Sequence, residues 1–132
     1  MRKLLFVCRE NVGRSQIAMA YYNDSHRDKA ESAGIIVDKP GEKLKDNKYA
    51  GRVIKTMLKD NIDISNSARS KLAEEKVADY EKIIVLAEPE VVPAWLQNLS
   101  QVEFWETKDL KYLDFPEVKK ICLKIKSKVS NL

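Results

Sequence analysis

Short strand-like runs alternate with helix-like segments along this chain, and the alternation constrains the fold more than any other feature. Four runs of five residues have the composition of strands: Leu4–Cys8, Glu31–Ile35, Lys82–Leu86 and Gln101–Trp105. Helix-like segments come between and after them: Arg14 to about Arg27, Lys48–Asp60, Ser65–Ala73 and a last one from Pro116 onward. Strands separated by helices require right-handed crossovers and a mostly parallel sheet. The sequence therefore predicts an α/β fold, and 132 residues suit a single domain spanning 1–132.

Three local signals set expected helix boundaries. Asn61 can end the second helix in the left-handed conformation. The polar run 65–67 offers an N-cap for a short helix that continues through Ala73. Pro116 fits the first turn of the last helix, in which apolar residues recur at helical spacing.

The loop that follows the first strand has the composition of an anion-binding site. It reads Cys8-Arg9-Glu10-Asn11-Val12-Gly13-Arg14-Ser15, and a helix follows it. In parallel sheets, ligands bind at the carboxyl ends of strands, which is where Cys8 stands. Backbone N–H groups of such a loop can converge on an anion, and the helix N-terminus adds partial positive charge. We therefore predict that phosphate binds to these residues: Arg9, Glu10, Asn11, Val12, Gly13 and Arg14.

Four side chains of the loop suggest chemistry. A thiolate at Cys8 would be stabilised by the loop amides and could act as a nucleophile. The planar fork of Arg14 can grip two phosphate oxygens at once. Ser15 can donate a hydrogen bond to the sulfur, and Gly13 permits backbone angles that a side chain would resist. Each residue alone fits a packing or surface role, but their combined spacing favours a functional site. Neither a Walker loop nor a dinucleotide fingerprint is present.

The loop resembles the Cys-x5-Arg-Ser signature of protein tyrosine phosphatases. Its place at the start of the chain is similar to that in the low-molecular-weight class and in the related thioredoxin-coupled arsenate reductases, and Asn11 matches an asparagine that both carry. Other segments resemble the family over most of the chain: Glu31-Ser32-Ala33-Gly34, Asn61-Ile62-Asp63-Ile64-Ser65, Tyr80-Glu81-Lys82-Ile83-Ile84-Val85 and Trp105-Glu106-Thr107-Lys108-Asp109-Leu110.

The resemblance implies a three-layer fold with a four-stranded parallel sheet flanked by helices. It also implies phosphate-monoester hydrolysis through a cysteinyl phosphate on Cys8, with Arg14 as the phosphate clamp and no metal or other cofactor. Expected partners are a phosphotyrosine protein or a small phosphate ester, and inhibitory oxyanions such as phosphate.

Two aspartates compete for the role of general acid. Asp109 stands where the resemblance places the catalytic aspartate, on a loop after the fourth strand. Asp114 precedes Pro116 and fits a cap of the last helix. We favour Asp109, although Leu110 replaces the family's proline and Lys111 replaces an aromatic residue, with Tyr112 one step later.

Composition excludes several classes of protein. The net charge of +4 comes from lysines interleaved with acids, which indicates a solvated surface without nucleic-acid binding. No apolar run is long enough for a membrane span or a signal peptide, so we expect a cytoplasmic protein. Two cysteines and one histidine make a disulfide framework or zinc site improbable. His26 fits a solvated loop, and Cys122 fits a buried packing position.

Two other functions stay open at this point. Arsenate reduction by the thioredoxin route needs further thiols, and the mid-chain segment 86–95 contains no cysteine, so only a variant that uses an external thiol remains. A non-catalytic phosphate-binding module would use the same loop without an effective acid. Glu10, at a position where glycine is common, either weakens anion binding or faces solvent.

Overall fold

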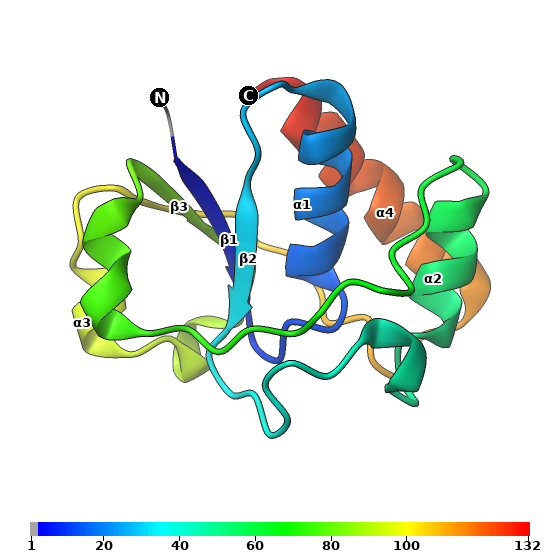
Figure 1. Ribbon diagram of the computed structural model, residues 1–132, viewed down its shortest axis with the longest axis horizontal. Coiled ribbons are helices and arrows are strands. Elements are labelled where there is room, and N and C mark those ends of the chain that lie inside the picture. Colours follow the sequence, from blue (N-terminus) through cyan, green and yellow to red (C-terminus); the bar gives the residue numbers. More distant parts are fainter. Residues whose placement is uncertain (1–2) are drawn as a thin grey trace.

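The computed structural model describes residues 3–132, and a four-stranded sheet forms its centre (Figure 1). The strands are β1 (Leu4–Cys8), β2 (Glu31–Gly34), β3 (Lys82–Val85) and β4 (Val102–Phe104). They lie in the order β2-β1-β3-β4, and all three pairs are parallel. The four predicted strands are thus confirmed, each to within one residue at either end.

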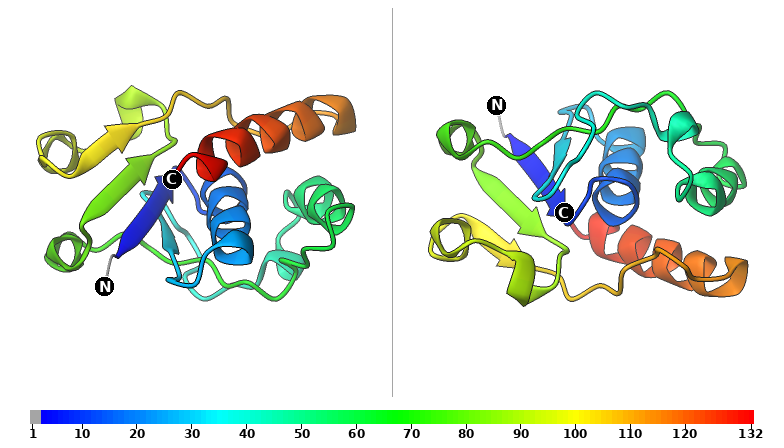
Figure 2. Two further views of the ribbon diagram at one scale, coloured as in Figure 1. Left: turned by 90° about the horizontal axis from the view of Figure 1, so that it is seen from above. Right: turned by 90° about the horizontal axis from the view of Figure 1, so that it is seen from below.

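Helices cover both faces of the sheet and make three layers (Figure 2). On one face lie α1 (Arg14–Ser25) and α4 (Phe115–Ser130), and α2 (Gly51–Leu58) packs against α4. On the other face lie α3 (Ala94–Gln97) and the 3-10 turn η2 (Glu74–Asp79). The short 3-10 turns η1 (Leu44–Asp46) and η3 (Pro89–Val91) complete the elements.

β1 is buried on both faces, which explains its unbroken apolar run. Because successive strand residues point in opposite directions, Leu4 and Phe6 join the core beneath α1 and α4. Leu5 and Val7 join a second core beneath α3 and η2. No helix within residues 3–132 is long and apolar enough to cross a membrane.

Two of the predicted boundary signals are confirmed, the left-handed Asn61 after α2 and the proline in the first turn of α4. Asn61 has a φ of 61° after α2, and the amide of Ile62 donates back to the Met57 carbonyl at 3.1 Å. At the start of α4, Asp114 Oδ1 accepts a hydrogen bond from the Glu117 amide at 3.1 Å. Asp114 is therefore the N-cap of α4, and Pro116 lies in its first turn.

The helix predicted from Ser65 through Ala73 is wrong. Ser65 and Asn66 form a turn, the rest of the segment is not helical, and Lys71 forms a parallel bridge with Gly34 at the end of β2. Tertiary contacts override the local cap signal here. Ser67 Oγ donates to Gln16 Oε1 at 2.7 Å, so one of the three residues that offered a cap binds α1 instead.

The second helix is shorter than the predicted Lys48–Asp60, because it begins only at Gly51 and ends at Leu58. Asn47 Oδ1 accepts a hydrogen bond from the Tyr49 amide at 2.9 Å, and this turn delays the helix. The turn also carries Tyr49 toward the carboxyl edge of the sheet.

Candidate active site

The loop from Cys8 to Ser15, called here the Cys8–Ser15 loop, joins β1 to α1 at the carboxyl edge of the sheet. α1 begins at Arg14, so its N-terminal amides face the region above Cys8. The loop turns at Asn11, whose φ of 58° is left-handed. Loop and helix start are therefore arranged as an anion site requires.

The side chain of Asn11 holds the loop from behind and is fully buried. Its Nδ2 donates to Ser15 Oγ at 2.7 Å and to Ser32 Oγ at 3.0 Å. Its Oδ1 accepts from the Ser70 amide at 2.8 Å and from Gln16 Nε2 at 3.2 Å. One side chain thus connects the loop to α1, to β2 and to the extended segment beyond it.

Cys8 and Ser15 are in direct contact, with 3.0 Å between Sγ and Oγ. Because Ser15 Oγ already accepts a hydrogen bond from Asn11, its own hydroxyl hydrogen is free to point at the sulfur. A hydrogen bond of that kind stabilises a thiolate over a thiol.

Gly13 precedes α1 with a φ of −119° and a ψ of −85°, outside the helical and strand regions. A Cβ there would also lie 2.9 Å from Leu110 Cδ1, the tip of a side chain that packs on the loop. Leu110, which stands where the family has proline, is buried against the loop.

Arg14 is buried and held by the loops that follow β3 and β4. Its Nη1 donates to the Leu86 carbonyl at 2.8 Å, to Glu88 Oε1 at 2.7 Å and to the Thr107 carbonyl at 3.1 Å. Every hydrogen bond of this guanidinium within residues 3–132 comes from Nη1. Nε has no hydrogen bond there and Nη2 has only a 3.8 Å ion pair with Asp109, so both can donate to an oxyanion in a two-point grip.

Asp109 lies beside Arg14, with 3.8 Å between Asp109 Oδ2 and Arg14 Nη2. Its Oδ1 accepts a hydrogen bond from the Lys111 amide at 3.1 Å, and this turn fixes the carboxyl group without the missing proline. The side chain is 41% exposed and lines the pocket above Cys8. Asp114, which caps α4, does not line that pocket.

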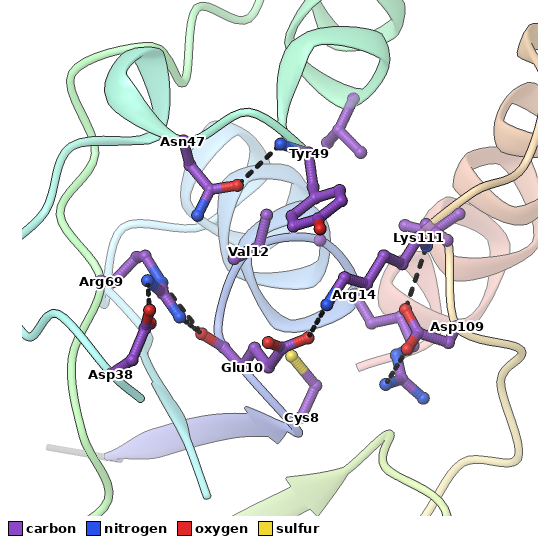
Figure 3. A pocket seen from close by; sticks show the side chains of 13 residues that line it. Cys8, Glu10, Val12, Arg14, Asp38, Asn47, Tyr49, Arg69, Asp109 and Lys111 are labelled. Carbon is purple, nitrogen blue, oxygen red and sulfur yellow. Dashed lines mark hydrogen bonds and ion pairs between the residues drawn. The ribbon is translucent and has the colours of Figure 1, made fainter. Parts of the chain in front are cut away.

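A pocket of about 70 Å³ lies over Cys8 and brings together most of the predicted site (Figure 3). Predicted residues that line it are Cys8, Glu10, Val12, Gly13, Arg14 and Asp109. Three predicted residues lie outside the lining: the side chain of Arg9 is exposed, while Asn11 and Ser15 are buried behind the loop. Their contribution is therefore indirect, through the backbone or through Cys8.

Sequence reasoning missed Arg69, which is almost fully buried beside the pocket. Its Nε and Nη2 both donate to the Glu10 carbonyl, at 3.1 and 3.0 Å. Its Nη1 pairs with Asp38 and Glu42, each at 2.9 Å. The hydrogen bond from Arg69 lowers the pKa of Asp38 below its ordinary value. No local pattern reveals this role, because Arg69 falls in the segment predicted to be helical.

Tyr49 and Lys111 are two further lining residues that the sequence did not single out. Tyr112, the aromatic residue expected near the site, is 80% exposed, and its ring lies 5.7 Å from the Tyr49 ring. Tyr49 is therefore the aromatic side chain at the pocket. The signal that could have found it is Asn47, whose turn sets its direction.

The remaining predicted residues lie elsewhere. Cys122 is buried on α4, and burial raises the pKa of its thiol to about 12. His26 ends α1 and stacks on Tyr22, with ring centroids 3.9 Å apart. Among the described residues, no group of three histidine, cysteine or acidic side chains is arranged to hold a metal ion.

Comparison with known proteins places these features in a family. No curated protein sequence matches the chain. Among solved structures, a YwlE mutant from Bacillus subtilis has a TM-score of 0.79 at 15% identity, covering 98% of this chain and 94% of that one. The tyrosine phosphatase AmsI from Erwinia amylovora has a TM-score of 0.82 at 14% identity, covering 98% and 89%. An arsenate reductase in the phosphate-binding state has a TM-score of 0.79 at 23% identity, covering 99% and 95%.

These likenesses show the shared fold, a four-stranded parallel sheet flanked by helices. The sequence profile of a family supplies the assignment, because it matches residues 3–132. This chain belongs to the low molecular weight phosphotyrosine protein phosphatase family.

Proposed function

We propose that this protein hydrolyses phosphate monoesters, with Cys8 as nucleophile, Arg14 as phosphate clamp and Asp109 as general acid. The observation that carries the proposal is that these three side chains line one pocket at the start of α1. Ser15 supports the nucleophile through its 3.0 Å contact with the Cys8 sulfur. The amides of residues 9–14 and the free edge of Arg14 supply donors for the phosphate oxygens.

The reaction proceeds in two steps. The Cys8 thiolate attacks phosphorus and forms an S–P bond, while the ester P–O bond breaks and Asp109 gives its proton to the leaving oxygen. A water molecule then attacks the cysteinyl phosphate, Asp109 takes the water proton, and the S–P bond breaks to release phosphate and the thiolate. The charge on the phosphoryl oxygens is stabilised by Arg14 and the loop amides.

The test is hydrolysis of a small aryl phosphate by the purified protein. Cys8→Ser and Arg14→Ala should abolish turnover, and Cys122→Ser is the matched control that removes the other thiol. Turnover that survives Cys8→Ser refutes the mechanism. Tight oxyanion binding with no turnover of any aryl or alkyl phosphate identifies a binding module instead.

Arsenate reduction with internal thiols is disfavoured by the position of the second cysteine. Cys122 lies in the core on α4, and its raised pKa keeps it a neutral thiol. It is a poor group to resolve an arsenylated Cys8. A coupled assay with thioredoxin and arsenate should show no NADPH consumption.

The proposed ligands are phosphotyrosine proteins or small phosphate esters, with inorganic phosphate as a competitive inhibitor. Tyr49 at the pocket supports an aromatic leaving group, because it offers a ring for contact. Location in the cytoplasm stays a prediction, supported by two free cysteines, Cys8 and Cys122.

A further inference from the structure

A charged pair spans the mouth of the pocket above Cys8. Glu10, on the Cys8–Ser15 loop, places its Oε2 3.5 Å from Lys111 Nζ, which comes from the loop before α4. Both side chains line the pocket and both are about two-thirds buried, at 30% and 27% exposure. Figure 3 shows Glu10 reaching from the loop toward Lys111 on the opposite wall.

Lys111 is set in surroundings that favour its charge. Its Nζ lies 4.3 Å from the centroid of the Tyr49 ring and 5.7 Å from that of Tyr112. Burial opposes the ammonium form, but attraction to Glu10, Tyr112 and Tyr49 outweighs it and raises the pKa of Lys111. Aromatic faces stabilise a cation without neutralising it, so this ammonium group would still attract an anion if Glu10 moved away.

Two other ion pairs among the described lining residues differ from this one, because each depends on a buried arginine. Asp38 is bound to Arg69, whose remaining donors hold the Glu10 carbonyl and Glu42. Asp109 lies 3.8 Å from Arg14. The two arginines are 2% and 3% exposed, whereas Glu10 and Lys111 are both partly exposed, so both of these side chains can turn toward solvent.

We propose that Glu10 and Lys111 form a charge gate, in which an entering anion displaces the Glu10 carboxylate and takes over Lys111. Closed, the pair lies over a pocket of about 70 Å³ in which Cys8 is 2% exposed. Open, it leaves an ammonium group at the entrance and turns one carboxylate toward solvent. Because only an anion can replace the Glu10 carboxylate beside Lys111, the pair favours entry of anionic ligands over neutral ligands of the same size. The inference builds on the proposed function, in which the ligand is a phosphate.

The gate can be tested without any phosphatase activity, by alkylation of Cys8 with two reagents. Iodoacetate is anionic and iodoacetamide is neutral, and both react with the same thiolate. The ratio of their rates therefore cancels any change in the fraction of ionised Cys8. Mass spectrometry of the Cys8 peptide reads the rates site by site, so Cys122 does not interfere.

Glu10→Gln should raise the ratio of iodoacetate to iodoacetamide rates by about twofold to fivefold, the range expected for a partly exposed ion pair. Lys111→Met should lower that ratio by a similar factor. When Lys111 is already Met, adding Glu10→Gln should change the rate ratio by less than about twofold, because without Lys111 nothing holds the Glu10 carboxylate across the mouth. Inorganic phosphate should protect Cys8 from iodoacetamide at lower concentration in Glu10→Gln than in the wild type.

Matched controls are Glu90→Gln and Lys108→Met, exposed charges outside this pocket, which should leave the ratio unchanged. An unchanged ratio in Glu10→Gln overturns the gate, whether or not the protein hydrolyses phosphates. Strictly additive effects in the double variant also overturn it, since they indicate two independent charges. A normal gate response in a protein without turnover would instead count against the proposed function alone.

Discussion

Replacing Gly34 by alanine would push a methyl group into the backbone of the Cys8–Ser15 loop. Gly34 ends β2, and a Cβ there would lie 2.7 Å from the Glu10 carbonyl carbon and 2.8 Å from the Asn11 nitrogen. It would also lie 2.7 Å from Val37 Cγ2. Two of these three atoms belong to the main chain, so a side-chain rotation cannot relieve the clash.

The size of the effect follows from these distances. The closest approach is about 0.7 Å short of the 3.4 Å at which ordinary van der Waals contact begins. The loop must move by several tenths of an ångström, and a misplacement near 1 Å can cost about 100-fold in rate. We expect Gly34→Ala to lower kcat/KM for an aryl phosphate by about 10- to 100-fold. Overpacking should reduce the free energy of unfolding by about 1–3 kcal/mol.

The assay combines steady-state kinetics, inhibition by phosphate and urea denaturation. Gly51→Ala is the matched control, because no atom lies within 4 Å of the added methyl group at the start of α2. It should leave kinetics unchanged and raise stability by about 0.4–1 kcal/mol. Wild-type kcat/KM and phosphate inhibition in Gly34→Ala would refute the claim that this contact holds the loop.

Three further predictions concern single side chains. Asp109→Asn should lower turnover of a substrate with a poor leaving group by about 10²–10⁴-fold and leave phosphate inhibition similar. Asp114→Ala should instead lower the free energy of unfolding by about 0.5–2 kcal/mol. If kinetics and melting show that Asp114→Ala loses turnover and Asp109→Asn loses stability, Asp114 is the general acid. Asn11→Ala should cost about 3 kcal/mol or more in urea denaturation, because it strands buried partners and because alanine tolerates the left-handed conformation less well than asparagine does. A loss below about 1 kcal/mol would contradict this. Burial raises the pKa of Cys122 from 9.0 to about 12, so between these pH values the folded state keeps a proton that the unfolded chain loses, and stability falls as pH rises. Cys122→Ala should make the free energy of unfolding fall less steeply with pH, by up to about 1.4 kcal/mol per pH unit, as read from urea midpoints between pH 9 and 11. An unchanged slope would contradict the raised pKa of Cys122.

The site residues that could be predicted are those whose position follows from one strand and one helix. Cys8 ends a buried strand and Arg14 begins a helix, so their meeting is dictated locally. Asp109 was placed at the same edge by the family resemblance and by its position on a loop after the fourth strand. The strand and helix that hold Cys8 and Arg14 depend on short-range periodicity, which a single sequence records well.

The unpredicted part of the site depends on contacts between distant segments. The polar run 65–67 was expected to cap a helix, but its last residue, Ser67, binds Gln16, 51 residues away in the sequence. Arg69 follows it into the interior and binds the Glu10 carbonyl. A helix N-cap stabilises by about 1 kcal/mol, and the hydrogen bonds of Ser67 and Arg69 to distant residues together stabilise the extended form by more than that. The extended segment that results is what supports the loop from the side of β2.

The attachment of Arg14 has a consequence for how the molecule loses order. Its Nη1 joins the loops after β3 and β4 through Leu86, Glu88 and Thr107. β4 has three residues and lies at the sheet edge, where sub-global opening costs least. If β4 detached, Thr107 and Asp109 would leave with it, and Trp105, which packs against Phe6, would be drawn out of the core beneath α1. Opening of this edge strand would therefore release the clamp on Arg14 and switch the site off.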